Sequence, residues 1–183
     1  MIQERYFSVD VESSGPIPGK YSMLSLGACV VGAPERSFYV EIKPVSDEFL
    51  PEALRISGFD LHRLRHDGKT PKEAMRAFRA WVEAEAGHCR AVFVGFNSCY
   101  DWQFVNWYLE MFGGGNPFGF GGVDIKSYFM GLSGRPWSET TSSRLPPKFQ
   151  PDEPQTHNAL DDARAQASIF SKLMENKTRG SVD

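Results

Sequence analysis

The sequence predicts an α/β fold in which a central mixed β-sheet carries α-helices on its faces. Three segments near the N-terminus have strand character and are separated by short turns, which is typical of an antiparallel meander. Farther along, helical segments alternate with a buried strand, as in sheets built from strand–helix units. The chain of 183 residues fits one domain, and we expect a single domain over residues 1–183 with its core at about 5–175.

The composition is that of a globular protein, with a mild formal net charge of −3. This charge gives no basic footprint for nucleic acid, but bound divalent cations can supply positive charge where phosphate sits. Cys29, Cys89 and Cys99 form no C-x-x-C pair, so we expect reduced thiols, mostly in the core, and no structural zinc site. The chain has neither the apolar run of a signal peptide nor that of a membrane span, so we expect a cytoplasmic protein with no membrane partner.

The meander is expected over Arg5–Glu12, Tyr21–Val31 and Arg36–Pro44, where Val and aromatic residues are frequent. The turn residues of SSGPIPGK and GAPE separate these strands. The following DEFLPEALRISG segment (residues 47–58) is expected to be a short helix or irregular.

The clearest helix is TPKEAMRAFRAWVEAEAG, because Thr70 suits the N-cap, Pro71 the first helical position and Gly87 the end. One face of this helix is apolar and should be buried: Ala74, Phe78, Trp81 and Val82. The almost continuously apolar run at 90–96 predicts a buried strand. We further expect helices at 101–115, 123–132 and about 158–177, and a long surface loop at 133–155.

Two acids end the first strand. Asp10 and Glu12 are two residues apart, so both side chains project from the same face of the strand. Carboxylates this close raise one another's pKa unless a cation neutralises them. The pair is therefore either a solvent-facing strip or a metal site, and the turn directly after Glu12 places it where α/β sites tend to lie.

A second candidate pair follows the buried strand at 90–96. Asp101 opens a helix there, so it is either a first-turn acid favoured by the helix dipole or a site residue. Asn97 is likewise either a turn residue or a side chain that reaches the site.

The segment THNALDDARAQA, residues 156–167, begins the last helix. Asn158 suits the N-cap, and Asp161 can complete a pair like a capping box. His157 then lies just outside the helix. Asp162 shares its helix face with Ala159, Ala165 and Ile169, so we expect Asp162 to point inward and Asp161 to be structural.

Together these acids and the histidine predict a metal-dependent phosphoryl-transfer site. Four carboxylates suit Mg²⁺ or Mn²⁺, which prefer oxygen ligands. Two such ions can stabilise the attacking and leaving oxygens of an in-line displacement. A histidine beside them is a natural general base.

With these residues the chain resembles the DEDDh (DnaQ-like, RNase T-like) 3'–5' exonucleases of the ribonuclease H-like fold. The first motif, D-x-E-[ST]-[ST]-G, is matched by residues 10–15, and the second, an Asn four residues before an Asp, by Asn97 and Asp101. The third, H-x-A-x-x-D-A, is matched by residues 157–163. The motifs come in the family's order, and the resemblance covers residues 6–173.

The resemblance implies that Asp10, Glu12, Asp101 and Asp162 hold two Mg²⁺ or Mn²⁺ ions and that His157 deprotonates the attacking water. Nucleoside 5'-monophosphates would leave the 3' ends of single-stranded RNA or DNA or of short oligonucleotides, with RNA slightly favoured. Many small members are dimers, so a homodimer is a further expectation. The substrate-binding residues implied by the motifs, or expected from the loop before the third motif, are Ser13, Ser14, Gly15, Ile17, Asn97, Arg135 and Lys148.

Three features depart from the family pattern or extend it. PIPGK follows the first motif, so Pro16 or Ile17 would have to act as the apolar wedge against the last base. SLGACV stands where many members have an acid in the second strand. The loop at 133–155 carries Arg135, Trp137, Arg144 and Lys148, which suit either a single-stranded backbone with base stacking or a solvated loop with one anchoring Trp.

Two other functions remain open at this stage. A Mg²⁺-dependent phosphatase would use Asp10 as the covalent nucleophile of a D-x-D strand motif. Glu12 in place of the second Asp, and His157, do not fit that function. A non-catalytic nucleic-acid-binding module would bind without cleavage, but it gives no reason for four convergent carboxylates, which repel phosphate in the absence of metal.

Overall fold

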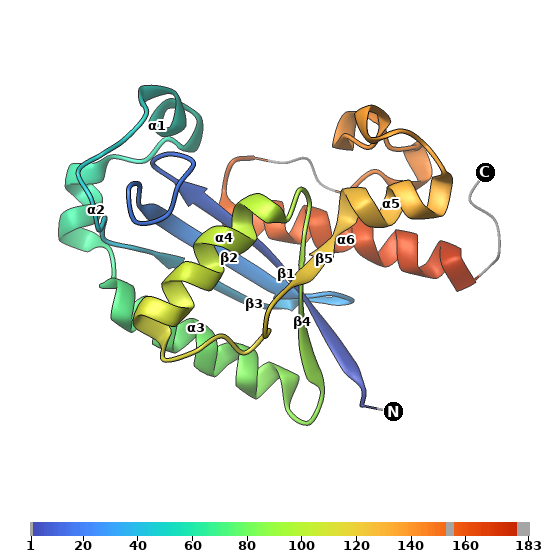
Figure 1. Cartoon of the computed structure of the whole chain (residues 1–183), viewed down its shortest axis with the longest axis horizontal. Coiled ribbons are helices and arrows are strands. Elements are labelled where there is room, and N and C mark those ends of the chain that lie inside the picture. Colours follow the sequence, from blue (N-terminus) through green and yellow to red (C-terminus); the bar gives the residue numbers. More distant parts are fainter. Residues whose placement is uncertain (1, 153–155, 179–183) are drawn as a thin grey trace.

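The computed structural model of the chain describes residues 2–152 and 156–178, and its centre is one mixed five-stranded sheet (Figure 1). The strand order is β3-β2-β1-β4-β5. The pairs β1–β2 and β2–β3 are antiparallel, whereas β1–β4 and β4–β5 are parallel. The predicted mixed sheet is therefore confirmed. Its strands are β1 (Glu4–Ser13), β2 (Met23–Val30), β3 (Ala33–Glu41), β4 (Arg90–Gly95) and β5 (Gly122–Asp124).

Helices flank the sheet (Figure 1). The α-helices are α1 (Pro51–Ser57), α2 (Leu61–Asp67), α3 (Pro71–Ala86), α4 (Cys99–Tyr108), α5 (Ile125–Ser133) and α6 (Ala159–Thr178). A π-helical turn, η1 (Leu109–Gly113), continues α4, and three short 3₁₀ turns follow α5: η2 (Trp137–Glu139), η3 (Ser142–Arg144) and η4 (Pro147–Phe149).

One face of the sheet packs against α3 and α4. Phe7, Val9 and Val11 alternate with the polar residues of β1 and join one buried cluster with Phe78 of α3 and Phe104 of α4. The predicted start of α3 is confirmed, because the side chain at its N-cap and the acid three residues later form a reciprocal capping box.

The long helix α6 packs against the other face of the sheet. Its apolar residues Ile169, Phe170 and Leu173 form a buried cluster with Val94 of β4 and with α5. At its N-terminus the helix crosses β2 directly above Gly27, where an added Cβ would lie 2.2 Å from the carbonyl carbon of Ala159. The lack of a side chain at this position therefore lets the first turn of α6 approach the sheet.

Several sequence expectations need correction. The third strand begins at residue 33 and ends at 41, and the helix after β4 begins at residue 99 and becomes a π turn at 109. Helix α2 and the three-residue strand β5 were not expected. The segment at 133–155 is not wholly a surface loop, because Leu145, directly after η3, and Phe149 of η4 are buried in the same cluster as Ile169, Phe170 and Leu173. Residues 153–155 lie outside the described residues.

The cysteines also differ from expectation in their burial. All three are free, but only Cys29 is buried, whereas Cys89 is half-buried and Cys99 is exposed at the start of α4. Within the described residues, no helix has both the length and the apolar character that a membrane crossing requires.

Candidate active site

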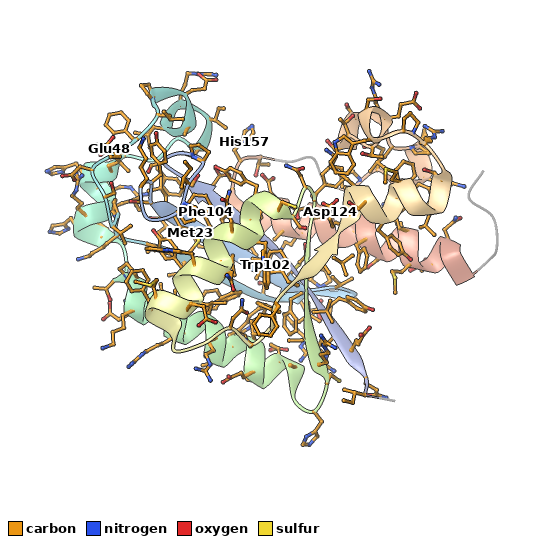
Figure 2. The ribbon with its side chains drawn as sticks, in the orientation of Figure 1. Met23, Glu48, Trp102, Phe104, Asp124 and His157 are labelled. Carbon is orange, nitrogen blue, oxygen red and sulfur yellow. The ribbon has the colours of Figure 1, made fainter. Side chains whose placement is uncertain are left out.

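The predicted acids meet in one pocket at the edge of the sheet where β1 ends. Figure 2 shows His157 on the segment that leads into α6, at this edge. The pocket is lined by residues from β1, the β4–α4 turn, α4 and the start of α6: Asp10, Val11, Glu12, Phe96, Asn97, Tyr100, Asp101, His157 and Asp162.

Strand β1 supplies two acids on its α6 side. Asp10 pairs across the sheet with Gly27, and Glu12 pairs with Ser25. The register shifts directly after Glu12, which marks a bulge or irregularity at the end of the acidic pair. The acids therefore lie at the last regular positions of the strand, as the turn residues in the sequence indicated.

Asp101, in the first turn of α4, is held against β1. Its Oδ1 accepts a hydrogen bond of 3.1 Å from the backbone N–H of Val11. The β1–β4 pairing ends at Ser8 and Val94, so the carboxylate supplies an acceptor to β1 beyond the last paired residue of β4. This bond fixes Asp101, which is 5% exposed, beside Asp10 and Glu12.

Two pocket residues have left-handed backbone conformations. Asn97 has φ 63° and His157 has φ 59°, and these are the positive-φ residues other than glycine in the described chain. For an L-residue this conformation costs about 1–2 kcal/mol, less for Asn. Strained backbone of this kind collects at functional sites, and here it turns the chain into α4 and into α6.

The two adjacent aspartates of α6 are unequal, as predicted. Asn158 caps the helix, with its Oδ1 accepting from the N–H groups of Leu160 at 3.0 Å and Asp161 at 3.4 Å. Asp161 is exposed and accepts from the hydroxyl of Thr156 rather than completing a capping box. Asp162 is 5% exposed, lines the pocket and accepts from the N–H of Thr156 at 2.8 Å.

Burial and mutual repulsion make the four carboxylates hard to ionise. Burial, followed by the charges of Asp101, Asp162 and Glu12, raises the pKa of Asp10 well above its usual range. Burial and Asp162 raise the pKa of Glu12 to about 7. Burial also raises the pKa values of Asp101 and Asp162. No lysine or arginine is among the described residues that line the pocket.

This donor set fits a hard divalent cation. It consists mainly of carboxylate oxygens, which Mg²⁺ and Mn²⁺ prefer. Ligand atoms of Glu12, His157 and Asp162 lie within 4.8 Å of one another. A cation at this place would remove the repulsion that makes the carboxylates hard to ionise.

The turn after Glu12 is held by one hydrogen bond of its own and by bonds to neighbouring segments. The Ser13 hydroxyl donates to the Gly15 carbonyl at 2.9 Å and meets the hydroxyl of Tyr100 at 2.7 Å. The Ser14 hydroxyl donates to a backbone carbonyl and accepts the N–H of residue 22. A Cβ on Gly15 would lie 2.5 Å from the ring of Tyr21, so close packing explains this glycine. The two hydroxyls thus organise the turn.

An apolar pocket adjoins the acids on the side of α1. It shares Val11, Glu12 and Tyr100 with the acidic pocket. Its other lining residues are Ser13, Gly15, Pro16, Leu50, Glu52, Ala53 and Ile56. Of the two wedge candidates, Pro16 lines this pocket, while Ile17 is 53% exposed beside it in the chain.

The basic candidates in the segment after α5 are not brought to the acids. Arg135 is exposed in the segment that leads to η2. Lys148 lies with Lys172 and Glu175 beside the C-terminal half of α6. Trp137 is exposed, and the Lys126 ammonium lies 4.0 Å from the centre of its ring.

The sequence did not identify two side chains of the site. Tyr100, directly before Asp101, lines both the acidic and the apolar pocket. No sequence pattern distinguished it from a core residue of the helix. Gln166 contacts Asp10 through a hydrogen bond of 2.6 Å. Its spacing of four residues from Asp162 on one helix was the signal that could have found it.

Two sequence comparisons with known proteins point to exonucleases. The sequence model of the RNase T exonuclease family matches residues 7–170. An Escherichia coli protein named 3'-5' DNA exonuclease Cap18 is 45% identical over 179 residues, which are 96% of this chain and 96% of that protein.

Solved structures share the fold. The nuclease domain of 3'hExo, a DEDDh family member bound to rAMP, superposes with a TM-score of 0.74 at 12% identity, covering 94% of this chain and 92% of that chain. E. coli exonuclease I in complex with a dT13 oligonucleotide gives a TM-score of 0.68 at 16% identity, over 97% of this chain and 42% of its own. These likenesses place the sheet and its helices in the ribonuclease H-like fold that the resemblance implied.

Proposed function

The chain belongs to the RNase T exonuclease family, and from this premise we propose that it is a metal-dependent 3'–5' exonuclease acting on single-stranded DNA ends. The observation that carries the proposal is the convergence of four carboxylates in one pocket together with His157. Because these carboxylates repel a phosphodiester, substrate can enter only when cations neutralise them.

Asp10, Glu12, Asp101 and Asp162 are the residues that would hold two Mg²⁺ or Mn²⁺ ions. When bound, such ions stabilise the attacking and leaving oxygens of an in-line phosphoryl displacement. The chain's own contribution is to converge these acids: Val11 anchors Asp101, and Thr156 anchors Asp162.

His157 is proposed as the general base. Its ring nitrogen lies within 4.8 Å of carboxylate oxygens of Glu12 and Asp162, and its side chain is exposed, so water reaches it. His157 takes a proton from this water as the water oxygen bonds to phosphorus. The bond from phosphorus to the 3' oxygen of the preceding nucleotide breaks, this oxygen takes up a proton from solvent to become the new 3'-hydroxyl, and a nucleoside 5'-monophosphate leaves.

The apolar pocket beside Glu12 is proposed to receive the 3'-terminal nucleoside. Pro16 on one side and Leu50 and Ile56 around α1 offer apolar contact for a base. The turn formed by Ser13, Ser14 and Gly15 would present its backbone to the terminal 3'-hydroxyl. Asn97 would complete the substrate contacts from the other side of the acids.

DNA is proposed as the substrate because the E. coli protein that is 45% identical to this chain is named a DNA exonuclease. The slight preference for RNA expected from the resemblance rests on weaker ground. Among solved relatives, one is described in recognition of a histone mRNA stem-loop and another in complex with dT13, both at low identity.

Five further sequence predictions stay proposals. Arg135 would contact phosphates upstream of the terminal nucleotide, and Ile17 would contact the last base. Lys148 would need substrate to extend along α6 to reach it. A homodimer and a cytoplasmic location are likewise proposed.

The test uses 5'-labelled DNA and RNA oligonucleotides with Mg²⁺, with Mn²⁺ or with EDTA. We expect stepwise 3' shortening and nucleoside 5'-monophosphates with either metal, faster on DNA, and none in EDTA. Asp162→Ala should be inactive, with Asp161→Ala as the matched neighbour that stays active. Unchanged cleavage by Asp162→Ala would refute the assignment of Asp162 to the active site.

The same experiment separates the two other functions. A phosphatase would trap phosphate on Asp10 and leave the oligonucleotide length unchanged. A binding module would retard the oligonucleotides without shortening them. Either result in place of 3' shortening would overturn the proposal.

A further inference from the structure

The amide of Gln166 connects parts of the site that come from three segments of the chain. Gln166 lies on α6, is 1% exposed and donates from Nε2 to Oδ1 of Asp10 at 2.6 Å. Its Oε1 accepts the backbone N–H of Phe96 at 2.9 Å. One buried side chain thus joins α6 to β1 and to the end of β4.

Chemistry fixes the orientation of this amide. A backbone N–H only donates hydrogen bonds, so the carbonyl of Gln166 must face the N–H of Phe96. The NH₂ group then faces Asp10. A flipped amide would lose both bonds, so Gln166 has one state that satisfies its surroundings.

Each segment that Gln166 joins carries an acid of the site or leads into a helix that carries one. Asp162 is four residues earlier on the same helix and therefore on the same face. Phe96 precedes Asn97, whose left-handed backbone turns the chain toward Asp101. Gln166 consequently fixes the spacing of α6, β1 and the β4–α4 turn at one point.

We propose that Gln166 is a positioning residue that orients the carboxylate of Asp10 for cation binding. By holding Oδ1, it leaves Oδ2 of Asp10 as the oxygen for the cation. A neutral donor suits this role, because a lysine or arginine at the same place would neutralise Asp10 and compete with the cation. The inference rests on the proposed metal site but concerns the resting protein without substrate.

Comparable partners of metal ligands typically change affinity by about 10–100-fold when they are removed. Gln166→Met keeps the length of the side chain and removes both bonds. The matched control is Gln150→Met, because Gln150 also makes two amide bonds, to the carbonyls of Ser142 and Leu145, but does not line the acidic pocket. Gln166 is buried and Gln150 is half-buried, and each variant loses two amide hydrogen bonds.

The readout is the Mn²⁺ dissociation constant of the substrate-free protein, measured by calorimetry, together with thermal unfolding in EDTA. We expect Gln166→Met to weaken Mn²⁺ binding about tenfold or more and Gln150→Met to leave it unchanged. In exonuclease assays, Gln166→Met should need more Mn²⁺ for half-maximal rate. A purely structural role predicts a lower Tm in both variants with unchanged Mn²⁺ affinity, and that result would overturn the inference.

Gln166→Asn serves if Gln166→Met does not fold, because it stays polar but is one methylene too short for both partners. It should weaken Mn²⁺ binding in the same way, and wild-type affinity would contradict the proposal. Failure of the proposed function looks different: a wild-type protein that binds Mn²⁺ but shortens no oligonucleotide would refute the exonuclease and leave the role of Gln166 standing.

Discussion

Replacing Glu12 by Gln should stabilise the protein at alkaline pH while it weakens the metal site. Glu12 has its pKa raised from 4.5 to about 7, first by burial and then by the charge of Asp162. Each pKa unit corresponds to about 1.4 kcal/mol, so ionised Glu12 costs the folded state about 3 kcal/mol. Gln has nearly the same shape and no charge, so it avoids this cost.

The pH dependence follows from the direction of the change. Between pH 4.5 and about 7 the folded protein holds a proton on Glu12 that the unfolded chain has lost. Stability due to this residue therefore falls as pH rises through that window, and the loss is complete above it. We expect Glu12→Gln to be about 3 kcal/mol more stable than wild type at pH 8 and less than about 1 kcal/mol more stable at pH 5.

The assay is thermal unfolding in EDTA at both pH values. For a chain of this size, about 3 kcal/mol corresponds to a Tm increase of about 6–12 °C at pH 8. Glu110→Gln, an exposed glutamate replaced in the same way, should shift Tm at neither pH. Added Mn²⁺ should stabilise wild type more than Glu12→Gln, because binding to the folded state adds stability. An equal or lower Tm for Glu12→Gln at pH 8 in EDTA would refute the reasoning.

The remaining predictions concern α6, β2 and the β4–α4 turn. Asp161→Ala should lower Tm but keep exonuclease activity, whereas Asp162→Ala should lose activity and keep its Tm in EDTA; the opposite pattern would reverse their roles. Gly27→Ala should reduce kcat about 100-fold, because the added Cβ displaces the start of α6. Gly131→Ala is the control, because Gly131 has open space around it and its kcat should not change. Equal kcat values for the two variants would contradict the close approach of α6 to Gly27. Asn97→Gly should keep the Tm of wild type, whereas Asn97→Val should lower the free energy of unfolding by about 1–2 kcal/mol, because Val fits a φ of 63° poorly. Equal Tm values for the two variants would contradict backbone strain at this position.

The sequence was sufficient for the acids because each lies on an element with a clear local signal. Asp10 and Glu12 follow the two-residue period of a strand, and Asp162 follows the helical period set by small residues. Their convergence in one site was implied by the resemblance to the exonuclease family and not by a local pattern. The structure bears this out, since Asp10, Glu12 and Asp162 line one pocket.

Other features were out of reach because they depend on contacts between distant segments. Helix α2 buries only Leu61 and Leu64 within a polar stretch, and strand β5 has three residues beginning with glycine, so neither shows a periodic pattern. Gln166 forms hydrogen bonds with Asp10, 156 positions away, and with the backbone N–H of Phe96. No sequence pattern predicts such contacts. The placement of Lys148 beside Glu175 is likewise a tertiary result.

The close packing at Gly27 of β2 bears on how the terminal nucleotide is selected. The sequence has no acid in SLGACV, and the structure supplies a reason, because the backbone of Ala159 and Leu160 occupies the space above Gly27. Since a Cβ there would lie 2.2 Å from that backbone, a contact to the terminal base from this position is sterically closed. If the apolar pocket of Pro16, Leu50 and Ile56 receives the terminal nucleoside, as proposed, selection of that nucleotide would fall to this pocket. Apolar contact and shape distinguish bases weakly, so trimming by this enzyme should depend little on the identity of the 3'-terminal base.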